Sequence, residues 1–165
     1  MLSAPLQCQR MAATAEEYCR LIDGFKADKR DVSWVARMVK LLPRLHVSVI
    51  ALTMPACRLY HLPDDDERCE LYMHLHYALT GETLLWTVSN DYCMALQHRL
   101  CDRLADDFTD MYFDLKGGLE TMEFDPHLAM QDWACSFYLH WGRHLLDAEY
   151  WLNALSAGSR RHLLM

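Results

Sequence analysis

Two histidines, His140 and His144, are four residues apart in a stretch whose apolar residues repeat with helical spacing. One helix would carry both imidazoles on the same stripe, directed toward the core, with Asp147 beside them. Two histidines at this spacing can bind one metal ion, and neutral imidazole suits zinc, iron or nickel. The pair is therefore compatible with a metal site in which acidic residues supply the remaining ligands.

A column of carboxylates precedes these histidines in the chain. Asp107, Asp110 and Asp114 lie at the edge of another predicted helix, next to its apolar face. Like charges at this spacing repel one another mildly unless a positive group is near. They are either a solvated flank or the partners of buried cations or a metal.

The link between the two helices is short, so we expect them to be antiparallel neighbours. Buried imidazoles need hydrogen-bond partners, and the aspartates of the preceding helix can supply them. Three interpretations remain open at this stage: a His/Asp network that ties two helices together, a metal site, and an exposed ligand cleft. In the metal interpretation, Asp110, Asp114 or Asp147 completes the site with His140 and His144.

Two segments resemble a bacterial family known as domain of unknown function 5063. They are Ala105–Leu119 (ADDFTDMYFDLKGGL) and Trp133–His144 (WACSFYLHWGRH). The family has an Asp-Asp-Leu-x-Asp-x-x-x-Asp-Leu-Lys-x-Gly helix followed by a Trp-rich helix that ends in Trp-Gly. The stretch from Leu41 to Pro55 is similar to an earlier helix of the family with its closing proline. The resemblance implies a compact helical fold and no assigned activity.

The elements that must position these residues are predicted to be helices. Apolar spacing and helix-end residues place them at about residues 12–27, 31–52, 67–79, 100–116 and 125–155. Pro43 should kink or split the second helix, and Gly117-Gly118 should end the fourth. Asp125-Pro126 is typical of an N-cap followed by proline in the first helical turn. Residues 82–89 have strand-like composition, and we interpret them as an extended connector.

The fold class that follows is all-α. We expect one compact bundle of about five to seven helices over residues 1–165, with residues 1–10 and 157–165 as flexible ends. A chain of this length can bury a core without a disulfide or a metal.

Composition restricts the partners and the compartment. The formal net charge of −7 argues against nucleic acid and favours a basic partner. The most apolar stretch, Val47–Cys57, is too short to cross a bilayer, and the N-terminus lacks the pattern of a signal peptide. Seven scattered cysteines without a Cys-x-x-Cys pair indicate reduced thiols. The sequence therefore predicts a cytoplasmic protein.

No catalytic motif is present in the sequence, so whether the protein is an enzyme stays open. The leading hypothesis is a non-enzymatic interaction module that binds a protein partner, with no cofactor. Its candidate binding residues are Trp133, Trp141, Asp107, Asp110 and Asp114. The first alternative is a metal protein, hydrolytic or redox, that uses zinc or a similar ion. The second is a regulatory domain that senses a small ligand in an aromatic pocket around Trp133 and Trp141.

Overall fold

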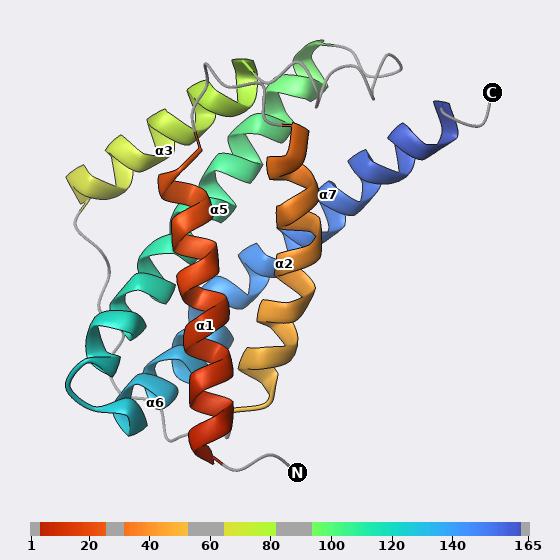
Figure 1. Cartoon of the computed structure of the whole chain (residues 1–165). Coiled ribbons are helices and arrows are strands. Elements are labelled where there is room, and N and C mark those ends of the chain that lie inside the picture. Colours follow the sequence, from red (N-terminus) through yellow and green to blue (C-terminus); the bar gives the residue numbers. More distant parts are fainter. Residues whose placement is uncertain (1–3, 26–31, 53–64, 82–93, 163–165) are drawn as a thin grey trace.

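Every regular element that the structure describes is helical (Figure 1). The computed structural model describes residues 4–25, 32–52, 65–81 and 94–162. The elements in chain order are α1 (Ala4–Asp23), α2 (Val32–Ile50), α3 (Asp65–Gly81), α5 (Met94–Met122), α6 (Pro126–Ser136), the π-helix η1 (Phe137–Trp141) and α7 (Gly142–His162). The predicted all-α bundle is confirmed.

Both ends of the described chain are more helical than the sequence predicts. Helix α1 begins at Ala4, so residues 4–10, expected to be a flexible end, are part of a helix. Cys8 is already buried there, and Met11 is completely inaccessible, which ties the first turns of α1 to the core. At the other end, α7 reaches His162, beyond the predicted end near residue 155.

One predicted helix end is wrong, and of the two outcomes predicted at Pro43 the split is excluded. Helix α5 continues through Gly117-Gly118 to Met122 instead of ending there. Helix α2 runs through Pro43 as a single element, because the loss of one N–H donor does not outweigh the packing of its apolar face. The predicted connector at residues 82–89 lies outside the described residues, and from Met94 onward the expected helical run is present.

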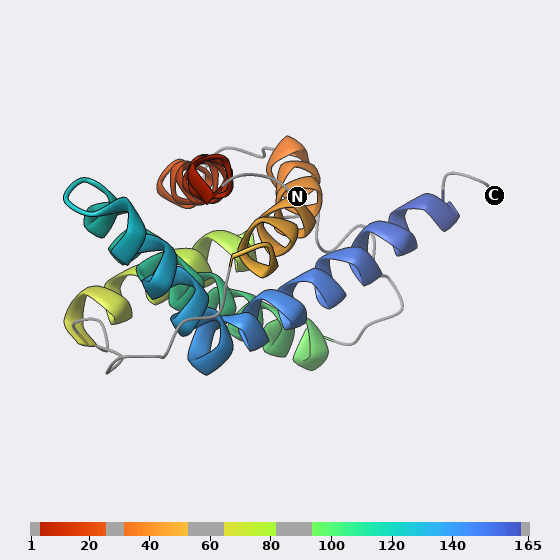
Figure 2. The same ribbon diagram turned by 90° about the horizontal axis from the view of Figure 1, so that it is seen from below.

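Helix α5 is the centre of the arrangement. It contacts α1, α3, α6 and α7, while α2 packs against α1 and α7. Figure 2 shows α1 and α2 on one side of the molecule and α5 and α7 on the other. The face that bears the candidate aspartates therefore lies between α3 and the last helical segment.

Hydrogen bonds hold large aromatic rings in place in the core between α1, α2 and α5. The buried Tyr18 hydroxyl donates to the Phe108 carbonyl at 2.8 Å. The Trp34 indole N–H donates to the Leu21 carbonyl at 2.8 Å, and its ring stacks on Phe25 at 4.0 Å. These bonds satisfy the polar ends of buried rings and so fix where α5 lies relative to α1 and α2.

Cys135 corrects one expectation from composition. Four cysteines, Cys8, Cys19, Cys69 and Cys101, are free thiols as predicted. Cys135 is disulfide-bonded, so the prediction of reduced thiols is wrong for this residue. Cysteine spacing without a Cys-x-x-Cys pair does not show which thiols are oxidised. None of the described helices has the length and apolar character needed to span a bilayer.

Candidate metal centre

The histidine-bearing helix begins at the position that the sequence predicts. The Asp125 side chain accepts hydrogen bonds from the amides of His127 and Leu128, and Pro126 occupies the first turn. The cap satisfies amides that have no partner inside the helix. The predicted N-cap is confirmed. Because it fixes where the helical segment begins, it also fixes the helical positions of His140 and His144 further along.

A π-turn interrupts this helix where the histidines begin. In η1 the Gly142 amide donates to the Phe137 carbonyl, five residues earlier in the chain. A Cβ added at Gly142 would overlap that carbonyl and approach the Phe137 ring, so glycine is the residue that this turn accommodates. His140 lies within η1 and His144 follows in the first turn of α7. Such π-turns inside α-helices are frequent at functional sites.

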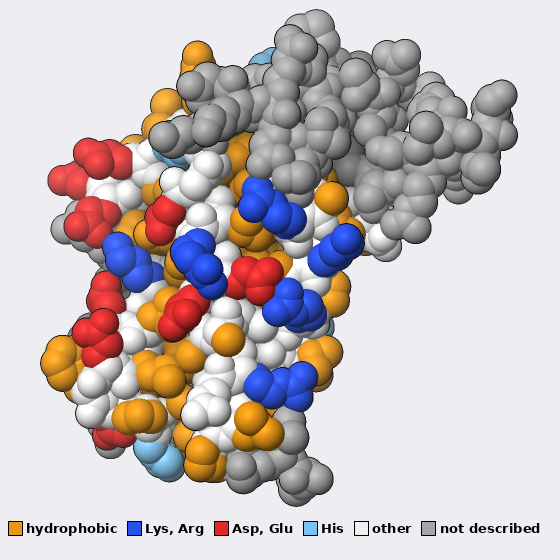
Figure 3. Space-filling view, viewed as in Figure 1, with side chains coloured by type: hydrophobic (Ala, Val, Ile, Leu, Met, Phe, Trp, Pro, Cys, Tyr) orange, Lys and Arg blue, Asp and Glu red, His pale blue; other side chains and the backbone are white. Residues whose placement is uncertain are grey.

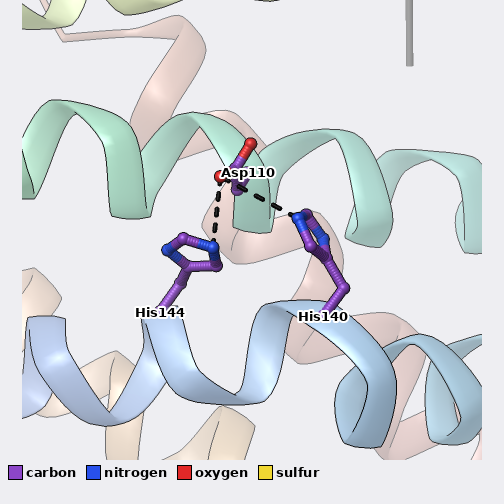
Figure 4. Close-up of side chains that lie close together, drawn as sticks. All are labelled: Asp110, His140 and His144. Atoms are coloured by element: carbon purple, nitrogen blue, oxygen red, sulfur yellow. Dashed lines mark ion pairs between the residues drawn. The ribbon is translucent and has the colours of Figure 1, made fainter. Parts of the chain in front are cut away.

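Both imidazoles converge on one carboxylate of α5 (Figure 4). The Nε2 atom of His144 lies 3.1 Å from Oδ2 of Asp110, and the Nε2 atom of His140 lies 3.9 Å from the same oxygen. One ligand atom from each of the three residues lies within 4.8 Å of the others. The two helices therefore place two imidazoles and one carboxylate around a single point.

The opposite nitrogen of each imidazole contacts a second aspartate of α5. The Nδ1 atom of His140 is 2.6 Å from Asp114, and the Nδ1 atom of His144 is 2.8 Å from Asp107. When Nδ1–H of a neutral imidazole donates to a carboxylate, the ring is held in the tautomer that carries its lone pair on Nε2, the atom that would bind a metal. Arg143 already donates to Nε2 of His144 at 3.2 Å, which requires a lone pair on that atom.

Helix α3 contributes an arginine to the cluster. The Arg68 guanidinium donates at 2.7 Å to Oδ1 of Asp110 and at 2.7 Å to Asp106. These charge-assisted bonds engage one oxygen of Asp110 and leave the other, Oδ2, facing the histidines. The Asp110 and Asp106 carboxylates raise the pKa of Arg68, against the opposing effect of burial, so it remains a cation.

The cluster is buried and carries more acidic groups than basic ones. The side chains of Asp107, Asp110, Asp114 and His144 are each 4–7% exposed. Burial raises the pKa of Asp107, although the hydrogen bond from His144 opposes this effect. The buried Oδ2 of Asp107 has no hydrogen-bond partner among the described residues. A concentration of buried carboxylates is stabilised by additional positive charge, from protonated histidine or from a metal ion.

Protonation of His140 is one source of that charge. The hydrogen bond to Asp114 raises the pKa of His140, and the charges of Asp114 and Asp110 act in the same direction against burial. Without a metal, a protonated His140 would therefore compensate part of the negative charge of the cluster. A divalent cation bound at Nε2 would take over that role.

The three converging atoms are compatible with a transition metal. Bonds of about 2.0–2.1 Å in tetrahedral geometry place zinc ligands roughly 3.3 Å apart, close to the 3.1 and 3.9 Å separations from Asp110. Two imidazoles and one carboxylate are the donor set of many non-haem iron(II) and zinc sites, which keep positions open for water. A second group, Asp106, Asp107 and His144, is less suitable because the Asp107–His144 bond already joins two of its three members. In the first group, a metal ion at Nε2 of His144 would have to displace Arg143.

The structure separates the predicted site residues into two sets. It brings together Asp107, Asp110, Asp114, His140 and His144. Asp147 is exposed and is not one of the three grouped ligands, although its charge contributes to the raised pKa of Asp107.

The two candidate tryptophans are core residues. Trp133 and Trp141 are both 0% exposed. The Trp133 indole donates to the Leu115 carbonyl, and the Trp141 indole donates to the Ser136 hydroxyl. Neither ring is accessible to a partner or a ligand in this structure.

Arg68 and Asp106 were missed by the sequence reasoning. Arg68 follows an acidic run in the chain and belongs to no motif, and its contact with Asp110 spans 42 residues. Asp106 precedes Asp107 by one residue and falls outside the predicted column. The column of aspartates was the only feature of the sequence that indicated a basic residue nearby, because buried carboxylates need positive charge close to them.

Comparisons with known proteins identify the fold and the family. A crystal structure of protein BF1032 from Bacteroides fragilis is similar, with a TM-score of 0.62 at 18% identity over 88% of this chain and 91% of that one. The comparison with curated proteins gave no match. The profile of the domain of unknown function DUF5063 matches residues 4–158, which is nearly the whole chain. The chain therefore belongs to the DUF5063 family.

Proposed function

We propose that this protein binds one divalent transition-metal ion, zinc or iron(II), through Asp110, His140 and His144. The observation that carries the proposal is the convergence of both Nε2 atoms on Oδ2 of Asp110. Each ring is at the same time held from behind by its own carboxylate, Asp114 or Asp107. An imidazolium that donates from both nitrogens would make the same contacts in a structural network, so the metal content of the protein decides between the two interpretations.

The chemistry of such a centre follows from its incomplete ligand set. Three protein ligands leave at least one position for water, and a bound metal lowers the pKa of that water toward neutrality. Asp107 and Asp114 would orient the rings, and Arg68 would hold Asp110 as a single-oxygen ligand. The proposal keeps the cytoplasmic location that composition predicts, although the disulfide of Cys135 departs from the reduced thiols expected there.

The test is the metal content of the full chain, purified without a tag and measured by plasma mass spectrometry. We expect close to one equivalent of zinc or iron per chain, lost in His144→Gln and in Asp110→Asn. The matched control is His46→Gln, because His46 also faces a carboxylate of α7, Glu149, but lies outside the cluster. Wild-type protein that binds neither zinc nor iron(II) on addition would exclude the proposal, as would variants with unchanged metal content.

A second candidate function is binding of a protein partner, and a specific observation favours it. Four large hydrophobic side chains on η1 and α7 are more than half exposed: Tyr138, Leu139, Leu146 and Tyr150. Asp147, which is also exposed, follows Leu146 directly in the chain, and the chain as a whole is acidic, so a partner with basic residues would fit. Figure 3 shows that another face, over α1 and α2, mixes side chains of both charges.

This second candidate predicts a loss of association in a double variant, Leu146→Glu with Tyr150→Glu, at unchanged helix content. Light scattering of the wild-type protein and crosslinking in cells provide the measurement. The control is Val47→Glu with Ile50→Glu, since these side chains of α2 are also more than half exposed. Identical crosslinking of all three proteins would exclude this surface.

A further inference from the structure

An arginine side chain occupies the nitrogen atom that would bind the metal. The Nε–H group of Arg143 donates to Nε2 of His144 at 3.2 Å. This bond requires a lone pair on Nε2, and the same atom lies 3.1 Å from the carboxylate oxygen Oδ2 of Asp110. Two acceptor atoms at this distance repel each other unless a positive charge is close to both. In the metal-free protein, the Arg143 guanidinium supplies part of that charge.

Arg143 is held more loosely than Arg68, the other arginine of the cluster. The bond to His144 is the one side-chain hydrogen bond of Arg143 within the part of the chain that the structure describes, and the residue is exposed on α7. Arg68 instead donates at 2.7 Å to two carboxylates. Bonds between oppositely charged groups are stronger than a bond to a neutral ring. A metal ion at the cluster would therefore displace Arg143 and leave Arg68 in place.

Asp147 offers a second position for the displaced guanidinium. It follows Arg143 by four residues on α7, and side chains at this spacing are neighbours on a helix, where opposite charges attract. Both residues are exposed, so the pair can form at the surface without any change in the core. The charge of Asp147 also contributes to the raised pKa of Asp107, which places Asp147 at the edge of the cluster. Arg143 thus has two alternative partners, one inside the cluster and one outside.

We propose that Arg143 is an intramolecular competitor of the metal ion, bound to His144 when the centre is empty and paired with Asp147 when the centre is filled. This inference rests on the proposed metal centre and describes its regulation. The ion takes the lone pair of His144 and repels the guanidinium, because two positive charges so close together are unfavourable. Since the ion must first displace Arg143, the arginine raises the metal concentration at which the centre fills.

The displacement itself can be observed in NMR spectra of the arginine Nε–H groups of the full chain, recorded before and after addition of zinc. The signal of Arg143 is assigned by its absence from the spectrum of Arg143→Met. We expect zinc to shift this signal. Asp147→Asn should change the Arg143 signal of the zinc-bound protein and leave that of the metal-free protein unchanged. An Arg143 signal that stays in place at saturating zinc would overturn the proposal.

The competition is measured as the zinc affinity of each protein against a coloured chelator. Arg143→Met should bind zinc about tenfold more tightly than the wild type, the equivalent of one hydrogen bond that no longer has to be broken. The control is Arg103→Met, which removes the same charge from an exposed position of α5. Because salt screens exposed charges, this variant should stay within about twofold of the wild type. An equal gain in both variants would show a general charge effect and overturn the competition.

The same titrations separate a failure of this inference from a failure of the metal centre. Equal zinc affinity of the wild type and Arg143→Met would overturn the role of Arg143 and leave the metal centre in place. If neither protein bound zinc or iron(II), the metal centre would be excluded, and the competition with it. Binding by Arg143→Met alone would support both, with Arg143 as the stronger competitor. The side chain of Arg143 is exposed, so we expect Arg143→Met to fold, with unchanged helix content by circular dichroism.

Discussion

Gly118 of α5 lies against the indole of Trp133 so closely that a Cβ at this position would overlap the ring. The indole N–H donates at 3.2 Å to the Leu115 carbonyl, one turn earlier on α5. Because Gly118 has no side chain, α6 can pack closely against α5. This contact precedes His140 and His144 in the chain and fixes the two helices relative to each other. At the neighbouring Gly117, an added Cβ would meet no atom of the described residues within 4 Å.

This difference between adjacent glycines predicts opposite effects on stability. Gly118→Ala should lower the free energy of unfolding by about 1–3 kcal/mol, because the core around Trp133 must shift. Gly117→Ala should raise it by about 0.5–1 kcal/mol, because alanine favours an exposed helix interior. Neither glycine has a positive φ, so the backbone tolerates both changes. Urea denaturation measures the effects, and equal values for the two variants would contradict the packing argument.

The second prediction concerns the pH dependence of metal-free protein. The pKa of His140 is raised above its ordinary value of 6.5, so its stabilising contribution is complete below that pH. This contribution is lost as the pH rises through the folded-state pKa. The pKa of Asp107 is also raised, so its contribution changes in the same direction, beginning above its ordinary value of 3.8.

We therefore expect the free energy of unfolding of chelator-treated protein to fall as the pH rises above about 6.5. His140→Gln should flatten this slope, whereas His127→Gln, with an exposed side chain, should leave it unchanged. Denaturation at several pH values provides the measurement. Metal affinity should rise over the same range, because binding requires a neutral imidazole. A stability that increases with pH in the absence of metal would disprove the His140 assignment.

The third prediction concerns the carboxylate behind His140. Asp114→Asn keeps the shape of the side chain but weakens its hold on Nδ1, so metal affinity should fall about 10–100-fold without being abolished. Competition with a coloured chelator measures the affinity. Asp132→Asn is the control, because Asp132 accepts from Thr121 and lies outside the cluster. Complete loss of metal in Asp114→Asn would make Asp114 a direct ligand instead.

The fourth prediction concerns the attachment of α3. Arg68→Ala removes the donor of a buried carboxylate and should lower the free energy of unfolding by about 2 kcal/mol. Arg103→Ala, at an exposed position of α5, should change it by less than about 0.5 kcal/mol. Thermal or urea unfolding measures both. Equal effects would show that the Arg68 pairs do not stabilise the protein.

Much of the fold and part of the site could be predicted from local patterns. Apolar spacing located the helices, and Asp125-Pro126 marked one start. The direction of His140 and His144 toward the aspartates of the preceding helix followed from the short link between the helices. The three aspartates of the predicted column, Asp107, Asp110 and Asp114, all belong to this cluster.

The remaining features depend on contacts that leave no local pattern. The ion pair of Arg68 with Asp110 joins residues that are 42 positions apart in the chain. The oxidised state of Cys135 has no signature in the cysteine spacing. Gly117-Gly118 has the composition of a helix end, and only the approach of Trp133 explains why the helix continues. The sequence likewise favoured Trp133 and Trp141 as binding residues, because aromatic composition does not distinguish a core ring from an exposed one.

The π-turn lets the last helical segment hold one residue more than an α-helix of the same length. Deletion of Tyr138, which is exposed, would allow an uninterrupted α-helix from Pro126 onward. The Gly142 amide would still pair with the Phe137 carbonyl, now as an ordinary bond between residues four apart, so α7 would keep its register. His144 would therefore stay opposite Asp110. Deletion of one residue between Gly142 and His144, where the helix has no extra residue to give up, would instead rotate everything beyond it by about 100° and shift it by about 1.5 Å along the axis.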